Sequence, residues 1–301
     1  MATQADLRQR VRNNVYGAYP TDQPFVTILG AAIADGTTTT VTVADGTDWS
    51  QGDVVEIDET AEQLMVTSIS TNDLTVLRGW NNTTAAAATD GGKIFKNPRF
   101  TIQQIDEGLD ACLASFESWG VHVFGTGSVT RDSLKYFYEL SETDINDAYG
   151  VLAVYYVELN TLIPVPLPFK FHQGLGTGDA NYSTGAGLQL AEWGDVSVGS
   201  AAQYVYAKNL TSVTDLGTNQ EEVLVLGATA LVLGKNIIPA SHDPGARTDR
   251  TIPVGQVGRD GRWFQGEFFI RVRAEAANVA TQRQKRFPST VRIARARRWR
   301  P

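Results

Sequence analysis

The chain has 301 residues, of which 42% are hydrophobic and 20% are charged, a balance typical of folded globular proteins rather than disordered ones. Its single cysteine, Cys112, excludes an intrachain disulfide and a zinc site built on several cysteines. The longest apolar run, at 223–234, is shorter than the ~20 residues that span a bilayer, and the first residues lack the apolar run of a signal peptide. We therefore expect a soluble protein of a reducing compartment, with no membrane partner.

The net charge of −7 is distributed unevenly along the chain. Residues 1–282 carry 18 basic and 33 acidic side chains, a net charge of −15, whereas residues 283–301 carry eight basic side chains and no acidic one. An acidic body with a basic end indicates that the C-terminal segment binds an acidic partner.

The first predicted element is a helix over residues 5–15, because Leu7, Val11 and Val15 recur every four residues. From residue 27 to residue 96 the apolar pattern instead alternates, with polar turns at 58–62 and 71–73. This alternation predicts a small β-barrel or sandwich. Within this range, the loop NNTTAAAATDGG at 81–92 consists of small residues that can lie close to another backbone.

Helical spacing returns after Thr101, which with Gln104 has the spacing of a capping box. The apolar face of this predicted helix consists of Ile102, Ile105, Leu109, Cys112, Leu113 and Phe116. Between residues 122 and 215, several short strands with glycine-rich turns predict a β-sandwich. They include LKYFYEL, which alternates over residues 134–140, and PVPLPFKFHQ, whose prolines suit an edge strand.

Two further helices are expected near the C-terminus. Thr218 and Glu221 have the spacing of a second capping box, before a helix that is apolar on every side and ends at Gly234. Such a helix must be surrounded by others. The last helix is expected over 262–286, and Pro288 ends it. Its apolar stripe consists of Phe264, Phe268, Val272, Ala276 and Val279.

Together these patterns predict an α+β protein: a discontinuous helical domain with two inserted all-β modules and an extended C-terminal arm. The predicted domains are a helical core (1–26, 98–121 and 216–288), a small β module (27–97), a β-sandwich module (122–215) and the basic arm (289–301). Insertions of this kind are tolerated when their ends lie close together.

The residues that might carry chemistry do not form a catalytic or metal-binding pattern. His122, His172 and His242 are far apart in the sequence and show no metal-ligand spacing, so we interpret them as individually packed or surface residues. Adjacent residues such as Ser241-His242-Asp243 cannot converge as a hydrolytic triad. The glycines of GLGTGDANY, at 174–178, lack the rest of a dinucleotide fingerprint and indicate a hairpin loop.

Two further clusters have a functional and a structural interpretation. Asp58, Glu59 and Glu62 could act as paired carboxylates, but their spacing matches no calcium loop and favours a solvated turn. Aromatic residues of the second β module could form a sugar-binding platform, although aromatic residues in strands are more often core. They are Tyr182, Trp193, Tyr204 and Tyr206. We therefore predict no enzyme activity and no cofactor.

The C-terminal arm is the strongest functional signal. Its apolar residues punctuate arginines, a composition enriched at interface hot spots, and the alternation in VRIAR suggests a strand that adds to a partner's sheet. A solvated tail and DNA binding are the alternatives. The predicted partner-binding residues are Val291, Arg292, Ile293, Arg295, Arg297, Arg298, Trp299 and Arg300.

One stretch resembles a known class of proteins. VTVADGTDWSQGDVVEID and MVTSISTNDLTVLRGWNNTTAAAA, within residues 41–88, resemble a β module common in structural proteins of tailed-bacteriophage virions. The order and length of the predicted helices, followed by an extended arm, resemble the head-to-tail adaptor (connector) family. That resemblance implies a homo-oligomeric ring of about twelve copies, a dodecamer, beneath the portal protein. It also implies that residues 289–301 dock on the portal.

The expected function is therefore that of a structural neck protein of the virion, assembled in the host cytoplasm. It would connect head and tail and leave a channel through which double-stranded DNA passes without sequence-specific binding. Tail or neck proteins would be further partners, and the module at 122–215 would face outward, where it could receive fibres. A tail, baseplate or fibre-attachment protein is the first alternative, and a carbohydrate-binding module is the second.

Overall fold

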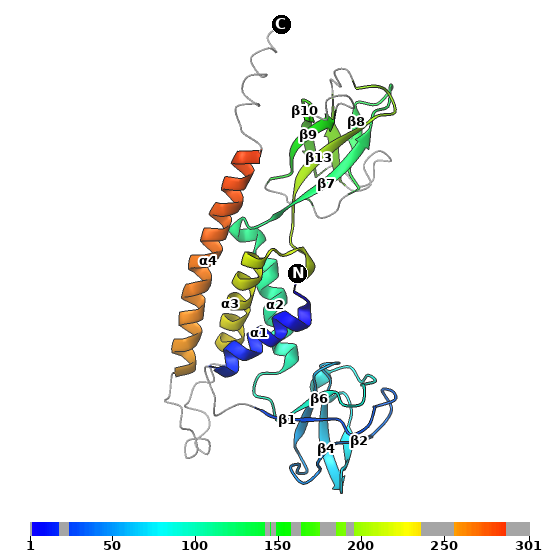
Figure 1. Ribbon diagram of the computed structural model, residues 1–301, viewed down its shortest axis with the longest axis vertical. Coiled ribbons are helices and arrows are strands. Elements are labelled where there is room, and N and C mark those ends of the chain that lie inside the picture. Colours follow the sequence, from blue (N-terminus) through cyan, green and yellow to red (C-terminus); the bar gives the residue numbers. More distant parts are fainter. Residues whose placement is uncertain are drawn as a thin grey trace. The chain divides into compact units, whose positions relative to one another are not determined.

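A computed structural model describes residues 2–17, 24–141, 145, 149–157, 164–174, 185–190, 196–235 and 256–286 (Figure 1). It contains four α-helices and thirteen strands within these ranges, which confirms the predicted α+β class. The chain divides into two compact units. One contains residues 2–112 and 222–268, and the other contains residues 113–221 with the end of the last helix. The four-part domain division drawn from the sequence remains a prediction.

The first unit begins with helix α1 (Gln4–Gly17), close to the predicted 5–15. Thr3 and Asp6 form a capping box at its start: the Asp6 N–H donates to Thr3 Oγ1 (3.2 Å) and the Thr3 N–H donates to the Asp6 carboxylate (2.9 Å). The predicted stripe is confirmed, since Leu7, Val11 and Val15 are fully buried.

A six-stranded antiparallel sheet follows α1, in the order β1-β6-β3-β4-β5-β2. Its strands are β1 (Phe25–Ile28), β2 (Thr40–Thr42), β3 (Val54–Ile57), β4 (Gln63–Ser70), β5 (Asp73–Leu77) and β6 (Lys93–Lys96). The ends of the two outer strands meet where Leu29 pairs with Val43, so the sheet curls toward a closed barrel. Apolar side chains that alternate along these strands fill its interior, among them Val55, Ile57 and Leu64.

The other α-helices of the described residues are α2 (Ile102–Ser115), α3 (Thr218–Lys235) and α4 (Gln256–Arg286). The Thr101–Gln104 capping box is confirmed: the Gln104 N–H donates to Thr101 Oγ1 (3.2 Å) and the Thr101 N–H donates to Gln104 Oε1 (3.3 Å). The second predicted cap is displaced by one residue. The Gly217 N–H donates to Gln220 Oε1 (3.1 Å), because α3 already begins at Thr218 and Gln220 is therefore its third residue.

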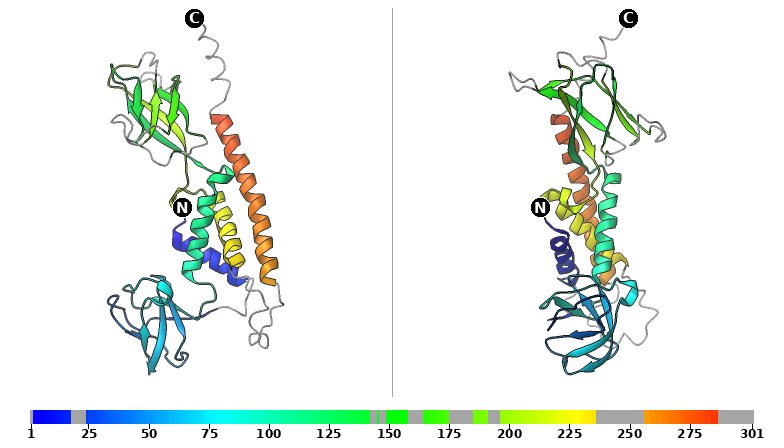
Figure 2. Two further views of the ribbon diagram at one scale, coloured as in Figure 1. Left: turned by 180° about the vertical axis from the view of Figure 1, so that it is seen from behind. Right: turned by 90° about the vertical axis from the view of Figure 1, so that its right-hand side faces the viewer.

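The apolar helix α3 is surrounded, as predicted, by helices of its own chain (Figure 2). A Cβ at Gly108 of α2 would lie 2.9 Å from Val232, and a Cβ at Gly227 of α3 would lie 2.2 Å from Cys112 Sγ. The same Cβ would lie 2.8 Å from the Phe268 ring of α4. Glycine at these positions allows the helices to approach to a distance that any side chain would prevent.

The second unit contains two antiparallel sheets, in the orders β10-β9-β13-β7 and β11-β12-β8. Their strands are β7 (Val123–Thr130), β8 (Phe137–Glu139), β9 (Val151–Val157), β10 (Pro164–Pro166), β11 (Lys170–Gln173), β12 (Ala186–Gln189) and β13 (Ala201–Lys208). Residues of both sheets form one core, including Val154, Leu188 and Tyr204, so the sheets pack as two layers. The proline strand β10 is an edge strand, as predicted.

Strand β8 is shorter than the alternating stretch 134–140 suggested. Leu134 and Tyr136 are 87% and 61% exposed, and the register with β12 covers Phe137–Glu139. The residues before it turn around the hydroxyl of Tyr138, which accepts the Asp132 N–H (3.2 Å) and donates to the Lys135 carbonyl (2.9 Å).

Candidate functional site

The predicted partner-binding residues of the arm all lie outside the described residues. They are Val291, Arg292, Ile293, Arg295, Arg297, Arg298, Trp299 and Arg300. Their role therefore stays a prediction. Within the first unit, the structure shows a polar joint between α1, the six-stranded sheet and the start of α2.

Arg12 is the centre of this joint. Although it lies on α1 beside the apolar stripe, it is only 5% exposed, and its guanidinium lies 3.9 Å from the centroid of the Phe95 ring. Nη1 donates to the carboxylate of Asp58 (2.9 Å), and Nη2 lies 3.6 Å from Oε2 of Glu56. One side chain thus connects α1 with strands β3 and β6 and with the β3–β4 turn.

Glu56 is fully buried in β3 and links the sheet to α2. Its Oε1 accepts the Ile102 N–H at the first residue of α2 (2.8 Å) and the side-chain amide of Gln63 (3.3 Å). A carboxylate at a helix N-terminus interacts favourably with the free N–H groups there. Glu56 Oε2 and Arg12 Nε have no hydrogen-bond partner among the described residues.

Burial raises the pKa of Glu56 to about 7, against the lowering effects of the Ile102 N–H, Arg12 and Gln63. The negative charge of Asp58 raises it further, and burial also raises the pKa of the nearby Tyr16 on α1. The loss of hydration thus outweighs the attraction of Arg12 at this carboxyl. The joint is a structural contact whose charge state depends on pH near neutrality.

A second buried ion pair corrects the interpretation of Glu62 as part of a solvated turn. Glu62 is fully buried, and both of its oxygens accept from the Arg78 guanidinium at 2.7 Å. It also accepts the N–H groups of Gly79 and Ala86. Arg78 in turn donates to the carbonyls of Asp35, Thr38 and Ala86. Four donor groups thus compensate the buried carboxylate, which the sequence spacing did not reveal.

The other two carboxylates of the cluster are also structural. Asp58 pairs with Arg12, and Glu59 accepts the N–H and the hydroxyl of Thr89, both at 2.9 Å. These bonds hold the pKa of Glu59 below its ordinary value. Because each carboxylate is bonded to a different partner, the three do not form an acid–base pair.

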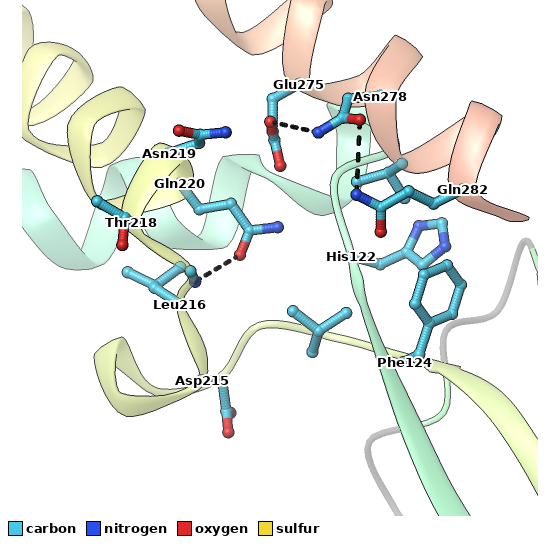
Figure 3. Close-up of a pocket in the computed structure, with 13 residues that line it drawn as sticks. His122, Phe124, Asp215, Leu216, Thr218, Asn219, Gln220, Glu275, Asn278 and Gln282 are labelled. Carbon is cyan, nitrogen blue, oxygen red and sulfur yellow. Dashed lines mark hydrogen bonds between the residues drawn. The ribbon is translucent and has the colours of Figure 1, made fainter. Parts of the chain in front are cut away.

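A pocket of about 450 Å³ lies within the second unit, beside the start of β7, the start of α3 and the end of α4 (Figure 3). Its polar lining consists mainly of amides and carboxylates: Asp215, Asn219, Gln220, Glu275, Asn278 and Gln282. Side chains of α4 hydrogen-bond along this lining, from Gln282 to Asn278 and from Asn278 to Glu275. Amides bonded to one another stabilise a wall rather than supply a nucleophile or base.

His122 borders this pocket and is packed rather than reactive. Its Nδ1–H donates to the Gly120 carbonyl (3.2 Å), and its ring lies between Phe124 and Tyr149. Burial lowers its pKa, and the charge of Arg283 lowers it further, so the ring is neutral at pH 7. His172, bonded to Gln189 (3.1 Å), is also a packed residue, which confirms the interpretation of these two histidines.

Other candidates from the sequence lie wholly or partly outside the described residues. His242 and the rest of Ser241-His242-Asp243 are among them, as are Gly176 and Gly178, whereas Gly174 has the positive φ (69°) of a turn residue. Of the proposed aromatic platform, Tyr204 and Tyr206 are buried in the core, and Tyr182 and Trp193 are not described. The described half of that platform is therefore unavailable to a sugar.

Over the described ranges, His, Cys, Asp and Glu side chains are nowhere grouped in threes that could hold a metal ion. The helices within those ranges are all too short or too polar to cross a bilayer.

Comparison with known proteins gives only distant similarity. No family model matches the chain, and no curated protein matches it. Among solved structures, a chain from the neck of an empty gene transfer agent (GTA) particle, computed with C6 symmetry, is 14% identical. That match covers 54% of this chain and 78% of that one, with a TM-score of 0.21. A chain from the virion of a native GTA particle is 10% identical, with coverages of 54% and 77% and a TM-score of 0.20. These TM-scores are too low for function to be inferred from either chain.

Sequence reasoning missed Arg12, Glu56 and Arg78, the charged residues that fix the small sheet. A signal was present in each case. Glu56 interrupts the apolar strand VVEI, Arg78 follows the apolar strand β5, and Arg12 adjoins the buried stripe of α1. A charged residue within an apolar pattern indicates a buried ion pair.

Proposed function

We propose that the protein is a structural component of a tailed-phage-type virion, a head-to-tail adaptor that forms a ring of about twelve copies under the portal. The observation that carries this proposal is the order of elements. A helix, a curled six-stranded sheet, a second helix, a two-sheet module and two further helices follow one another, before a basic C-terminal segment. This order agrees with the adaptor plan that the sequence resembles.

The polar joint supports a mechanical role for the small sheet. Arg12, Glu56 and Asp58 connect the sheet to α1 and to the start of α2, and a second pair fixes its long loop. A module that bears load in an assembly must keep its geometry when it is pushed or pulled. Buried ion pairs and hydrogen bonds that join several helices and strands meet that requirement better than a flexible linker would.

In this proposal the arm, residues 289–301, anchors the ring on the portal through its arginines and Trp299. The channel passes double-stranded DNA without binding its sequence, and an acidic body disfavours adhesion of the DNA backbone. The protein has no catalytic role. Tail or neck proteins, and fibres at the second β module, are the other proposed partners.

The test compares the full chain with a version ending at Pro288, each mixed with the portal protein of the same particle. Light scattering and negative-stain imaging would measure mass and shape. We expect the full chain to join the portal as a ring and the shortened chain to fail. If both remain apart from the portal, the adaptor proposal is wrong, and a tail or baseplate role becomes the next candidate.

A further inference from the structure

Helix α4 carries apolar side chains on two opposite sides. On one side Phe268, Val272 and Val279 are buried. On the other, Trp263 and Ile270 are 60% and 64% exposed. At 100° per residue, Trp263 and Ile270 lie within about 20° of one line along the helix, on the side opposite Val272. Large apolar side chains aligned along the exposed side of one helix form a patch of the kind that marks an interaction site.

The exposed line continues beyond these two residues. Ala274, Ala277 and Thr281 are exposed on the same side, which we call the outer face of α4 together with Trp263, Gly266 and Ile270. This face runs from Trp263 to Thr281, 18 residue steps or about 27 Å along one continuous helix (Figure 2). Its side chains differ in size: Trp263 is large, Ile270 is intermediate, and the alanines are small. Surfaces of this kind are found where another helix packs.

We propose that the outer face of α4 binds the outer face of α4 in a second copy, with the two helices antiparallel. If the two-fold axis passes beside Ile270, each Trp263 lies against the partner's Ala277. The two Ile270 side chains meet at the centre, and Gly266 lies beside the partner's Ala274. Each large Trp263 side chain thus meets a small alanine, and each Ile270 meets the partner's Ile270. A parallel pair would instead place tryptophan against tryptophan and alanine against alanine, which crowds one end and leaves the other loose.

Charge is complementary in the same orientation. In an antiparallel two-fold pair, each edge of the outer face meets the same edge of the partner. Glu267 and Arg271 lie on one edge, three residues before and one residue after Ile270. Each Glu267 therefore lies near the partner's Arg271, so opposite charges face each other twice across the contact. Arg273 lies on the other edge, where its guanidinium is 5.9 Å from the centroid of the Trp119 ring of its own chain.

This inference does not rest on the proposed adaptor function. A two-fold contact uses the same surface on both copies, whereas a closed ring of identical subunits uses two different surfaces. The α4 pair is therefore a property of the free chain, in which it covers apolar surface before any assembly partner is met. It can hold whether or not the protein joins a portal.

Cysteine cross-linking of the full chain, without any portal, tests both the contact and its register. The variant Ile270→Cys is expected to give a covalent dimer under mild oxidation, because its two copies meet at the axis. Trp263→Cys and Ala277→Cys are each expected to give little dimer alone but abundant dimer when mixed. Gln265→Cys, exposed on a different side of the helix, is the matched control. Wild type controls for Cys112, which is buried.

Several results would overturn the proposal. Equal cross-linking of Gln265→Cys and Ile270→Cys would mean random collision, and strong dimers from Trp263→Cys alone would mean a parallel pair. Sedimentation of wild type as a monomer up to about 100 µM would exclude a contact of useful strength. Ala277→Arg is expected to convert the dimer to a monomer with an unchanged circular dichroism spectrum, since Ala277 is exposed. A dimer that survives this change would also contradict the proposal.

Discussion

The buried charges of the small sheet differ in how completely their partners compensate them. Glu62 and Arg78 bond through two oxygens and two nitrogens, and backbone groups occupy much of what remains. Arg12 and Glu56 are farther apart, and atoms of both lack partners among the described residues. The first pair is therefore expected to behave as a fixed unit, and the second as a group that responds to pH.

Replacement of Glu62 by alanine should strongly destabilise the first unit. It would leave the Arg78 guanidinium buried without its counter-ion, which costs about 3–5 kcal/mol of unfolding free energy. Chemical denaturation followed by circular dichroism would measure this loss. The matched change Glu59→Ala removes an exposed carboxylate of the same turn that accepts hydrogen bonds from Thr89, so its cost should be much smaller than that of Glu62→Ala. Equal losses would show that the buried pair has no special role.

Glu56 should make stability depend on pH between about 4.5 and 7. Its pKa is raised in the folded state, so the native protein holds a proton that the unfolded chain releases. The resulting stability is present below pH 4.5 and is lost as the pH rises to about 7, by up to about 3 kcal/mol. In Glu56→Gln this contribution should vanish, which denaturant titrations at several pH values would detect as a flatter profile.

The comparison needs controls, because other groups also titrate. The lowered pKa of His122 acts in the opposite direction, but it is shared by wild type and Glu56→Gln and cancels in their difference. Hydrogen bonds from Thr37 and Thr38 lower the pKa of Asp35 from 3.8 to about 2, so the stability that Asp35 contributes is lost only as the pH falls through this range. Asp35→Ala should therefore lower stability by a constant amount at higher pH and change the slope of the profile only on the acid side. A Glu56→Gln profile parallel to that of wild type would contradict the assigned pKa.

At the scale of helices and strands, the glycines of α3 provide a direct test of helix packing. Gly227→Ala would place a Cβ against Cys112 and Phe268, and the overpacking should cost about 1–3 kcal/mol. Gly234→Ala lies on the same helix with open space around it, so it should be neutral or stabilising by up to about 1 kcal/mol. Thermal unfolding would compare the two. Similar effects at both positions would indicate that α3 does not pack as described.

Elements that are determined by residues close together in the sequence could be predicted, whereas those that depend on tertiary contacts could not. The helix after Thr101 and the turn at 71–73 follow from spacing within a few residues, and both are confirmed. The cap of α3 lies at Gly217, one residue before the predicted Thr218, and Gly217 lacks the side chain that normally indicates a cap. The stretch 134–140 alternates like a strand, yet Leu134 and Tyr136 are exposed. Alternation alone does not specify which residues find a neighbouring strand.

At the scale of the whole molecule, the basic arm should make binding to the portal sensitive to salt. Neutralising Arg295, Arg297 and Arg298 to glutamine should weaken capture at low salt and reduce its salt dependence, because fewer charges remain to be screened. Trp299→Ala should instead weaken capture by on the order of tenfold at every salt concentration, as expected for an apolar anchor. Surface-binding measurements from 50 to 500 mM salt, over which the Debye length shortens roughly threefold, would separate the two. Identical salt profiles for both variants would contradict these roles.

The division of the molecule into units depends on contacts between more distant residues than its class does. Composition and periodicity predict an α+β chain with two sets of strands, and that class is confirmed. The units depend on contacts between residues distant in sequence, such as Arg12 with Glu56 and Gly108 with Val232. One sequence contains no direct record of such contacts, so the buried charges that join α1 to the sheet could not be paired in advance.

The loop of small residues after β5 affects the local unfolding of the small sheet. Arg78 donates to carbonyls at Asp35, Thr38 and Ala86, and Ala88 pairs with Ile33 across the same gap. Two irregular segments are thereby fastened to each other and to the sheet. Their amide hydrogens at Ile33 and Ala88 should exchange with solvent as slowly as those of the strands, since they are released only when the sheet itself unfolds. A segment without regular structure would then belong to the most persistent part of the molecule.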